Sequence, residues 1–271
     1  MNSPAPESRL SVQGVTVRFG GLTALDDVSF EVAQGHVVGV IGPNGSGKTT
    51  LFNVICGFVR PTSGSLTWQG KTLRPRPDRL VRAGIARTLQ GVGLFERLTA
   101  LENVMVGAAR ARKAGFASAL FALPRSDRDE QRLRDEALDW LRRLDVADAA
   151  NRLPGTLPYP VQKRVSLARA LISRPRLLLL DEPAGGLGAE DMTHLAGLIR
   201  GLPEAGEWPC SVLLVEHHMD LVMSVCDQVV VLDFGRLVAS GTPDDVRSDP
   251  VVAAAYLGTD VPAEAELRAT P

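Results

Sequence analysis

The sequence predicts an α/β fold into which a helical subdomain is inserted, and three observations support this class. Short apolar runs typical of buried strands recur along the chain, and helical stretches separate them. Strands that alternate with helices in this way are expected to pair in a parallel sheet, because the helices serve as crossovers. A block from about Leu98 to Arg152 is instead rich in Ala, Arg and Leu and interrupts this pattern. The 271 residues suffice for one large domain or two modest ones.

Apolar residues alternate with polar ones near the N-terminus, and this period is typical of half-buried strands. The alternating apolar positions are Leu10, Val12, Val15, Val17, Val28, Phe30 and Val32. Later runs are continuously apolar, as expected for strands that are buried on both faces. These runs are Val37–Ile41, Leu177–Leu180, Val212–Val215 and Val229–Leu232. The sequence therefore predicts strands in both halves of the chain.

Helical signals occur after the first buried run, in the central block and near the C-terminus. Leu51–Val59 is predicted to be a helix. In the central block, apolar residues spaced for one helical face form a stripe, which we expect to be the core of the insertion rather than an interface. The stripe consists of Leu133, Ala137, Leu138, Leu141 and Leu144. Thr242 is predicted to cap a late helix that begins at Pro243, because proline is favoured at a first helical position.

Composition narrows the class of protein further. The 30 Lys and Arg against 31 Asp and Glu give a net charge of −1, whereas nucleic-acid-binding proteins normally carry a basic excess. No run approaches the roughly 18 consecutive apolar residues that a membrane span needs, and Met1–Ser8 lacks the apolar run of a signal peptide. The three cysteines lie far apart without metal-ligand spacing, which fits a reducing compartment. We therefore expect an intracellular chain that binds no nucleic acid.

The segment Gly42–Thr50 fits the pattern G-x-x-x-x-G-K-[ST] between a predicted buried strand and a predicted helix. In such a loop the glycines let backbone N–H groups face phosphates, and the helix N-terminus adds positive potential. Lys48 can reach the β- and γ-phosphates, and the Thr49 hydroxyl can ligate Mg²⁺. The alternative is a glycine turn with a chance Lys-Thr pair, which these flanks disfavour. The predicted nucleotide contacts are Gly42, Asn44, Gly45, Ser46, Gly47, Lys48, Thr49 and Thr50.

Two carboxylates end the buried run Leu177–Leu180, and Pro183 follows them. Asp181 is predicted to hold the Mg²⁺ shell, and Glu182 to orient or deprotonate the attacking water. Acids at a strand end also serve as helix caps, so the pair alone is ambiguous. A phosphate-binding loop earlier in the chain favours the catalytic interpretation.

The order of these motifs resembles that of the nucleotide-binding subunits of ABC transporters, over nearly the whole chain. Arg87–Gln90 resembles the family's Q-loop, which implies that Gln90 contacts Mg²⁺ and water and couples to the membrane subunits. Val215–His217 resembles the switch segment, which implies that His217 contacts the γ-phosphate. The loop around Phe19 resembles the aromatic loop, which implies that this ring stacks on adenine. We expect no metal site at His218, because adjacent residues point in different directions and no third ligand is spaced to help.

Within the family, the chain is most similar to the ATP-binding subunits of branched-chain amino acid importers and their relatives for urea and amides. The similarity lies in Phe19–Gly21, in the enlarged helical insertion, and in the endings Gly241–Pro243 and Ala255–Gly258. It implies the P-loop NTPase core of an ABC ATPase, with a mixed sheet, an antiparallel β subdomain and a helical subdomain. The implied division is residues 9–258 as a single domain, with 9–90 and 175–258 as the α/β core and β subdomain, about 91–174 as the helical subdomain, and 1–8 and 259–271 as flexible termini.

The resemblance also implies cofactors and partners. The chain would bind ATP with Mg²⁺, pair with a second ABC ATP-binding subunit in a homo- or heterodimer, and dock on two membrane permease subunits. A solute-binding protein would be an indirect partner. The expected location is the cytoplasmic face of the plasma (inner) membrane, as a peripheral subunit that hydrolyses ATP to power solute uptake.

The sequence departs from the family at the signature loop, which closes over ATP held by the partner subunit. The family usually has L-S-G-G-Q there, and its importers for branched-chain amino acids commonly have L-x-Y-G. The aligned residues here are Leu157, Pro158, Tyr159, Pro160, Val161 and Gln162. Pro160 stands where the last glycine would be, and proline lacks an N–H and has a fixed φ. Alternatively, Pro160 merely begins the following helix, where proline is favoured, and both interpretations can hold together.

A second departure follows Pro183. The usual S-A-L-D of the family's D-loop becomes Gly185–Gly188, so the aspartate expected at the dimer seam is missing. We therefore expect asymmetry in a heterodimer. ATP on this chain's own loop should hydrolyse when a partner's intact signature completes the site. ATP on the partner, completed by residues 157–162 of this chain, should turn over poorly.

The functional alternatives are ranked by these motifs. A regulatory or weakly hydrolytic ABC nucleotide-binding subunit with a degenerate signature loop is the main alternative. A soluble ABC ATPase of translation or DNA repair usually carries tandem cassettes or long coiled-coil insertions, which are missing here. A small-molecule P-loop kinase would not need Gln90, a signature-like segment and His217 in this order.

Overall fold

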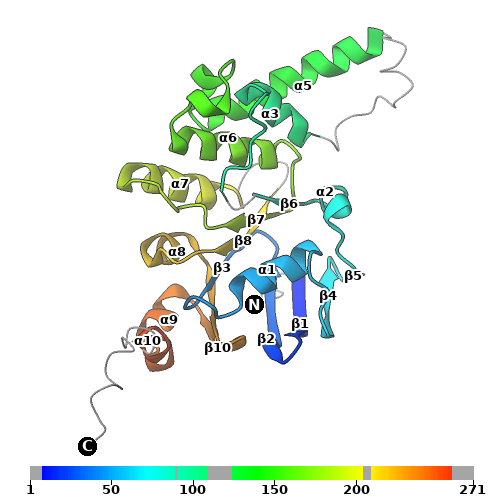
Figure 1. Ribbon diagram of the computed structural model, residues 1–271. Helices are drawn as coiled ribbons and strands as arrows, with labels where there is room; N and C mark the ends of the chain where they lie inside the picture. The colour runs from blue at the N-terminus through cyan, green and yellow to red at the C-terminus, as the bar shows by residue number, and fades with distance from the viewer. Residues whose placement is uncertain (1–7, 89–90, 109–123, 204–208, 258–271) are drawn as a thin grey trace, which may run out of the picture.

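The computed structural model describes residues 8–88, 91–108, 124–203 and 209–257, and its elements are labelled in Figure 1. The predictions for the termini and for Gln90 concern residues that lie outside the described part of the chain. Among the described residues, none of the helices combines the length and the apolar character that crossing a membrane requires.

A six-stranded sheet forms the centre of the molecule, with the strand order β10-β9-β3-β8-β7-β6. All neighbouring pairs are parallel except β10 with β9, so the sheet is mixed. The strands are β3 (Val37–Ile41), β6 (Ile85–Arg87), β7 (Leu177–Asp181), β8 (Ser211–Val215), β9 (Gln228–Asp233) and β10 (Arg236–Gly241). Every residue of β3, β7 and β8 is buried, which confirms the prediction of strands covered on both faces. Because these three strands are parallel neighbours, the segments that follow them emerge at one edge of the sheet.

A second, antiparallel sheet has the order β2-β1-β4-β5. Its strands are β1 (Ser8–Phe19), β2 (Leu22–Ala33), β4 (Ser63–Trp68) and β5 (Lys71–Leu73). The alternating apolar residues of β1 and β2 point into a core cluster that they share with the first helix and one face of the central sheet. This sheet is the antiparallel β part of the fold that the resemblance implied.

Helices cover the central sheet and close its crossovers. They are α1 (Lys48–Cys56), α2 (Leu80–Ala83), α7 (Ala189–Gly201), α8 (Met219–Val225), α9 (Pro243–Ser248) and α10 (Pro250–Leu257). The predicted bounds of the first helix were wrong: α1 begins at Lys48, directly after Gly47, and ends at Cys56. It ends there because Gly57 adopts a left-handed φ of 78° and its N–H turns back to the last carbonyls. The predicted cap of α9 is confirmed, since Thr242 and Asp245 form a reciprocal capping box.

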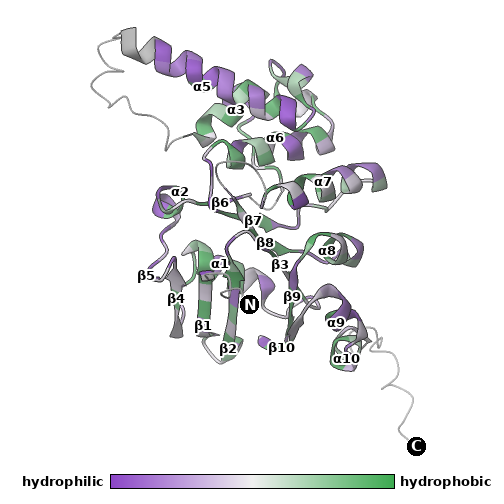
Figure 2. Ribbon diagram, turned by 180° about the vertical axis from the view of Figure 1, so that it is seen from behind, coloured by the Kyte–Doolittle hydropathy of each residue, from purple (hydrophilic) through white to green (hydrophobic). Residues whose placement is uncertain are grey.

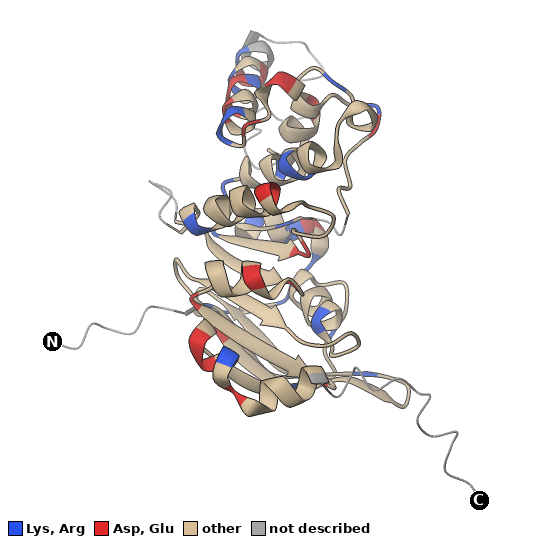
Figure 3. Ribbon diagram, turned by 90° about the vertical axis from the view of Figure 1, so that its left-hand side faces the viewer, with Lys and Arg blue, Asp and Glu red and all other residues tan. Residues whose placement is uncertain are grey.

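The remaining helices form a helical subdomain at one end of the molecule (Figure 1). They are α3 (Ala100–Gly107), α5 (Pro124–Arg143) and α6 (Tyr159–Leu171), with 3₁₀ turns at Ala147–Ala149 and Pro154–Thr156. Outside this subdomain, a 3₁₀ turn at Pro77–Arg79 precedes α2. Leu133, Leu141 and Leu144 are 7%, 0% and 1% exposed, which confirms that the apolar stripe is core. The outward side of α5 is hydrophilic (Figure 2) and carries charges of both signs (Figure 3).

Candidate ATP-binding and hydrolytic site

The glycine-rich loop lies between β3 and α1, as the sequence predicted, and its glycines are required by close contacts. Gly42 has a φ of 148°, and a Cβ there would lie 2.1 Å from the carbonyl oxygen of Leu232. Gly47 has a φ of 104°, and a Cβ there would lie 2.7 Å from the carbonyl oxygen of Ala24. Both positions need glycine because of backbone conformation and space. The loop is thus fixed from behind by β9 and β2, while Asn44, Gly45 and Thr49 are exposed.

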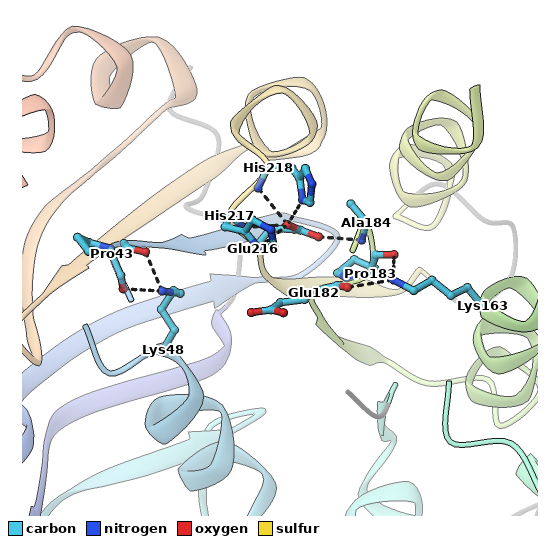
Figure 4. Close-up of polar contacts among 10 residues, drawn as sticks. Pro43, Lys48, Lys163, Glu182, Pro183, Ala184, Glu216, His217 and His218 are labelled. Carbon is cyan, nitrogen blue, oxygen red and sulfur yellow. Dashed lines mark hydrogen bonds and ion pairs between the residues drawn. The ribbon is translucent and has the colours of Figure 1, made fainter. Parts of the chain in front are cut away.

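Lys48 is the buried cation of this loop. Its Nζ donates to the carbonyl oxygens of Gly42 at 2.7 Å and Pro43 at 2.8 Å, as Figure 4 shows. Burial lowers the pKa of Lys48 below its ordinary value, and the nearby carboxylate of Glu182 opposes that shift. Ser46 Oγ is buried and has no hydrogen-bond partner among the residues that the structure describes. A cation and an orphaned hydroxyl in one loop are suited to a phosphate group.

Asp181 ends β7 and is only 6% exposed. Its Oδ2 accepts a hydrogen bond from Arg87 Nη2 at 3.0 Å, and the guanidinium of Arg87 also lies 4.9 Å from the centre of the Phe52 ring. Burial raises the pKa of Asp181, and the Arg87 guanidinium opposes that shift. One oxygen of Asp181 is therefore fixed by an ion pair at the edge of the sheet where Gly42–Thr50 also lies.

Glu182 is the residue after Asp181, and its backbone adopts the left-handed conformation, with a φ of 47°. Its N–H donates to the carbonyl oxygen of Val215 at 2.9 Å, which ties it to the end of β8. Its side chain points toward the side of the site on which Lys48 lies (Figure 4). This arrangement suits a group that contacts a water molecule next to a bound phosphate.

The switch segment begins where β8 ends. Glu216 is fully buried, and its carboxylate accepts hydrogen bonds from the N–H groups of Ala184, His217 and His218 at 2.7, 2.8 and 3.0 Å. Burial alone would raise the pKa of Glu216, but the hydrogen bonds from His218, Ala184 and His217 outweigh it and hold that pKa below its ordinary value. The side chain of His217 is 54% exposed, so it is free to meet a ligand.

The second histidine corrects one expectation. The rings of His217 and His218 do not point in different directions, because their centres are 4.2 Å apart and both Nδ1 atoms face Glu216. His218 Nδ1 lies 2.9 Å from Glu216 Oε2, so this ring supports the turn. The ligand atoms of Glu216, His217 and His218 all lie within 4.8 Å of one another, so the expectation that no third ligand lies beside the two histidines was wrong. In the structure, Glu216 uses its oxygens to accept hydrogen bonds that build the turn.

Phe19 lies at the end of β1 and is 52% exposed. An aromatic ring exposed to this extent can stack on a base. Its contact with adenine stays a prediction, as does the role of Gln90, which lies outside the described residues. The structure does describe Thr88, which is buried and whose N–H donates to the carbonyl oxygen of Leu179 at 3.0 Å.

The signature-like segment forms the beginning of α6. Pro158 is the N-cap, Tyr159 is the first helical residue and Pro160 is the second. The helix therefore begins one residue earlier than predicted, and Pro160 lies in its first turn, where proline is tolerated. Gln162 donates from Nε2 to the carbonyl oxygen of Leu157 at 2.9 Å, which folds the side chain back on the loop. Of the first three helical positions, only Tyr159 and Val161 carry an N–H that could face an anion.

Gly186, in the segment 185–188, packs against Tyr159 of the signature-like segment. Gly186 has a φ of 74°, and a Cβ there would lie 2.9 Å from Cε1 of Tyr159. Gly188 is the N-cap of α7. The signature-like segment and the segment after Pro183 are thus in contact, since the ring of Tyr159 occupies the space that a side chain at 186 would need.

The donor set fits a magnesium ion. Thr49 supplies a hydroxyl at the start of α1, and Asp181 supplies a carboxylate, and both are oxygen ligands that Mg²⁺ prefers. When bound, the ion would neutralise charge that develops on the phosphate oxygens. The chain's own groups can then bind a nucleoside triphosphate and activate a water molecule.

Sequence reasoning missed several supporting residues. Arg87 contacts Asp181, and Lys163 contacts the backbone of Glu182, only because the fold brings them together. No spacing in the sequence indicates either contact. Glu216 offered a signal, since a carboxylate directly after a buried strand needs several partners to remain charged.

The chain was compared with known proteins by sequence. A family model described as "ABC transporter" matches residues 25–185, and one described as "Branched-chain amino acid ATP-binding cassette transporter" matches residues 236–262. The high-affinity branched-chain amino acid transport ATP-binding protein BraF of Pseudomonas aeruginosa is 43% identical, over 92% of this chain and 97% of that protein. The corresponding protein LivG of Escherichia coli is 39% identical over the same shares.

Solved structures agree with the sequence comparisons. An ATP-binding cassette of an ABC transporter in its ADP conformation superposes with a TM-score of 0.79 at 30% identity, covering 93% of this chain and 99% of that one. A dimeric ATP-binding cassette in a post-hydrolysis state, bound to ADP and Pi, superposes with a TM-score of 0.72 at 25% identity, covering 86% and 98%. The similarity therefore extends over nearly the whole length of each protein.

Proposed function

The chain belongs to the ABC transporter family, and we propose that it is the ATP-binding, ATP-hydrolysing subunit of an importer for branched-chain amino acids. The observation that carries the proposal is the similarity to BraF over 92% of the chain, together with the site at one edge of the sheet. A related small polar solute, such as urea or an amide, is the second candidate for the cargo.

In the proposed mechanism, each group at the sheet edge has one task. The loop N–H groups and Lys48 bind the β- and γ-phosphates, and Thr49 and Asp181 hold Mg²⁺. Glu182 accepts a proton from the water that attacks the γ-phosphorus, while the bond to the β–γ bridging oxygen breaks and ADP and phosphate leave. His217 contacts the γ-phosphate, Phe19 stacks on adenine, and Gln90 contacts the Mg²⁺ and water.

We place the chain on the cytoplasmic face of the inner membrane, where it would pair with a second ABC ATP-binding subunit and dock on two membrane permeases. A dimer is supported by the cassette that superposes here and was solved as a dimer. We assign 9–90 and 175–258 to the core and β subdomain and about 91–174 to the helical subdomain. The N-terminus of α6 would then face ATP on the partner.

Uptake by intact cells tests the proposed function. In the source organism with this gene deleted, uptake of radiolabelled leucine, isoleucine and valine should fall, and the parent gene should restore it. Genes encoding Lys48→Met or Glu182→Gln should not restore it, whereas Lys71→Met, an exposed lysine on β5, should. Normal amino acid uptake in the deletion strain combined with a loss of urea or acetamide uptake would move the cargo to the second candidate. Normal uptake of every solute would contradict the proposal.

The alternative function is a regulatory or weakly hydrolytic nucleotide-binding subunit. Pro160 favours it, because the second position of α6 lacks the N–H that a glycine would supply. Turnover by the purified chain alone, compared with turnover beside a subunit that has an intact signature, separates the two functions. Slow turnover both by the chain alone and by the chain with that subunit would support the regulatory function.

A further inference from the structure

The backbone of Glu182 adopts a conformation that residues with a side chain rarely occupy, because its φ of 47° lies in the left-handed region. Such strain persists only where neighbouring groups over-determine the conformation. The N–H of Glu182 is held by the carbonyl oxygen of Val215 at 2.9 Å. Its carbonyl oxygen accepts the N–H of Gly185 at 3.3 Å, a long bond that leaves this oxygen able to accept from a second donor.

Lys163 holds the carbonyl side from α6. Its Nζ donates to the carbonyl oxygens of Glu182 at 3.2 Å and Pro183 at 2.7 Å (Figure 4). The same ammonium lies 5.3 Å from the centre of the Tyr159 ring, so it lies between the signature-like segment and the catalytic segment. Burial lowers the pKa of Lys163, and the carboxylates of Glu216 and Glu182 oppose that shift.

Glu216 holds the next turn from the opposite side. Its Oε1 accepts the N–H of Ala184 at 2.7 Å, whereas its Oε2 accepts the N–H groups of His217 and His218 and contacts His218 Nδ1 at 2.9 Å. The two oxygens therefore have separate tasks: one ties the segment after β7, and the other builds the switch turn.

We propose that Lys163 and Glu216 are positioning residues for Glu182. Lys163 of α6 and Glu216 of the switch segment hold the backbone of residues 182–184 by hydrogen bonds. This inference rests on the proposed role of Glu182 as the base that activates water. Because these hydrogen bonds act on backbone atoms, they set where the carboxylate of Glu182 points. These hydrogen bonds also connect α6, through residues 182–184, to Glu216 and the adjacent switch histidine His217.

Two substitutions remove the hydrogen bonds to residues 182–184 while leaving the rest of the fold in place. Glu216→Gln keeps the shape but leaves one acceptor oxygen. If that oxygen serves the switch turn, the amide NH₂ faces the N–H of Ala184 and the tie to residue 184 is lost. Lys163→Met keeps the length of the side chain and removes its donors, while Lys163→Arg restores donors. Glu31→Gln and Lys71→Met are matched controls, because both residues are exposed on the antiparallel sheet.

The experiment measures ATP turnover with Mg²⁺, at saturating and limiting ATP, by the full-length chain paired with a subunit that has an intact signature. We expect Lys163→Met and Glu216→Gln each to lower kcat about tenfold or more, since small displacements of a catalytic group have effects of this size or larger. KM should stay within about twofold. Lys163→Arg should recover about half of the parent kcat, and both controls should match the parent. In a Glu182→Gln background, adding either substitution should cause no further loss.

Hydrogen exchange of the Ala184 amide, followed by NMR, gives a readout that does not depend on turnover. Exchange at Ala184 should be about tenfold faster in Glu216→Gln and unchanged in Glu31→Gln. Parent kcat in both variants, losses that persist in the Glu182→Gln background, or unchanged exchange would each overturn the inference. A parent chain that neither binds nor hydrolyses ATP would instead overturn the proposed function. The exchange measurement would still test whether Glu216 holds the Ala184 amide.

Discussion

At the scale of single residues, the proposed chemistry depends on charges held by specific partners rather than on residue type alone. Lys48 is held by loop carbonyl oxygens, Asp181 by Arg87, and Glu216 by backbone N–H groups. The loop, the acidic pair and the switch histidine could be predicted from the sequence, because their order along the chain is distinctive. Arg87 could not be assigned its role, since β6 and β7 become neighbours only through the sheet.

Lys48→Met tests the phosphate-binding loop. We expect the Kd for ATP to rise about 10- to 100-fold, because a charge-assisted hydrogen bond contributes about 1.5–3 kcal/mol. Titration calorimetry with ATP measures the change, and Lys71→Met serves as the control. An unchanged Kd would remove Lys48 from the site.

Pro160→Gly tests the effect of the departure in the signature-like segment. In a complex assembled with a partner, glycine would restore an N–H at the second position of α6, so steady-state ATP turnover should rise. Loss of one such donor lowers rates by roughly 10²–10³ in other enzymes, and recovery at one of two sites should be smaller. An unchanged turnover rate would leave the predicted asymmetry of the two ATP sites without a basis.

Glu216 also gives a prediction for pH. Its folded-state pKa lies below the ordinary value of 4.5, so its carboxylate stabilises the fold above that pH, and this contribution is lost as the pH falls through the folded pKa. Charged or titratable groups near it are His217, His218, Lys163 and Asp181. Urea unfolding should show Glu216→Gln about 1–3 kcal/mol less stable at pH 7, with a smaller difference below pH 4.5. A difference that is constant with pH would show that the charge of Glu216 is unimportant.

At the scale of elements, periodicity predicted the strands and the buried face of α5, but the start of α1 was missed. Lys48–Thr50 carries no apolar period, and the helix begins there because Gly47 can adopt the left-handed conformation that joins it to the loop. The chemistry of the loop and the beginning of the helix are thus one feature. Sequence patterns place the apolar parts of helices more reliably than their polar ends.

The core of the helical subdomain gives a prediction of stability. Leu144 is 1% exposed, so Leu144→Ala should lower the free energy of unfolding by about 2–5 kcal/mol. Leu153→Ala, at a residue that is 45% exposed in the same subdomain, should cost well under half as much. Urea unfolding followed by circular dichroism measures both variants. Equal effects would contradict the assignment of the apolar stripe (Leu133 to Leu144) to the core.

At the scale of the whole molecule, the parallel order of β3, β8 and β7 explains why distant segments form one site. Lys48 comes after β3, His217 after β8 and Glu182 after β7, and parallel pairing brings all three to one edge. The helical subdomain adds α6, whose lysine reaches the same edge. The sequence could not predict that contact, because it depends on how the subdomain packs on the sheet.

In the proposed function, this edge of the central sheet is a single ATP-hydrolysing site in which Glu182 activates water. One measurement compares ATP binding and Mg²⁺-dependent turnover by the parent chain and by Glu182→Gln, each paired with a subunit that has an intact signature. We expect the Kd for ATP to agree within about threefold, while turnover falls by about 10²-fold or more, the size typical of losing a general base. Parent-level turnover in Glu182→Gln would contradict the claim.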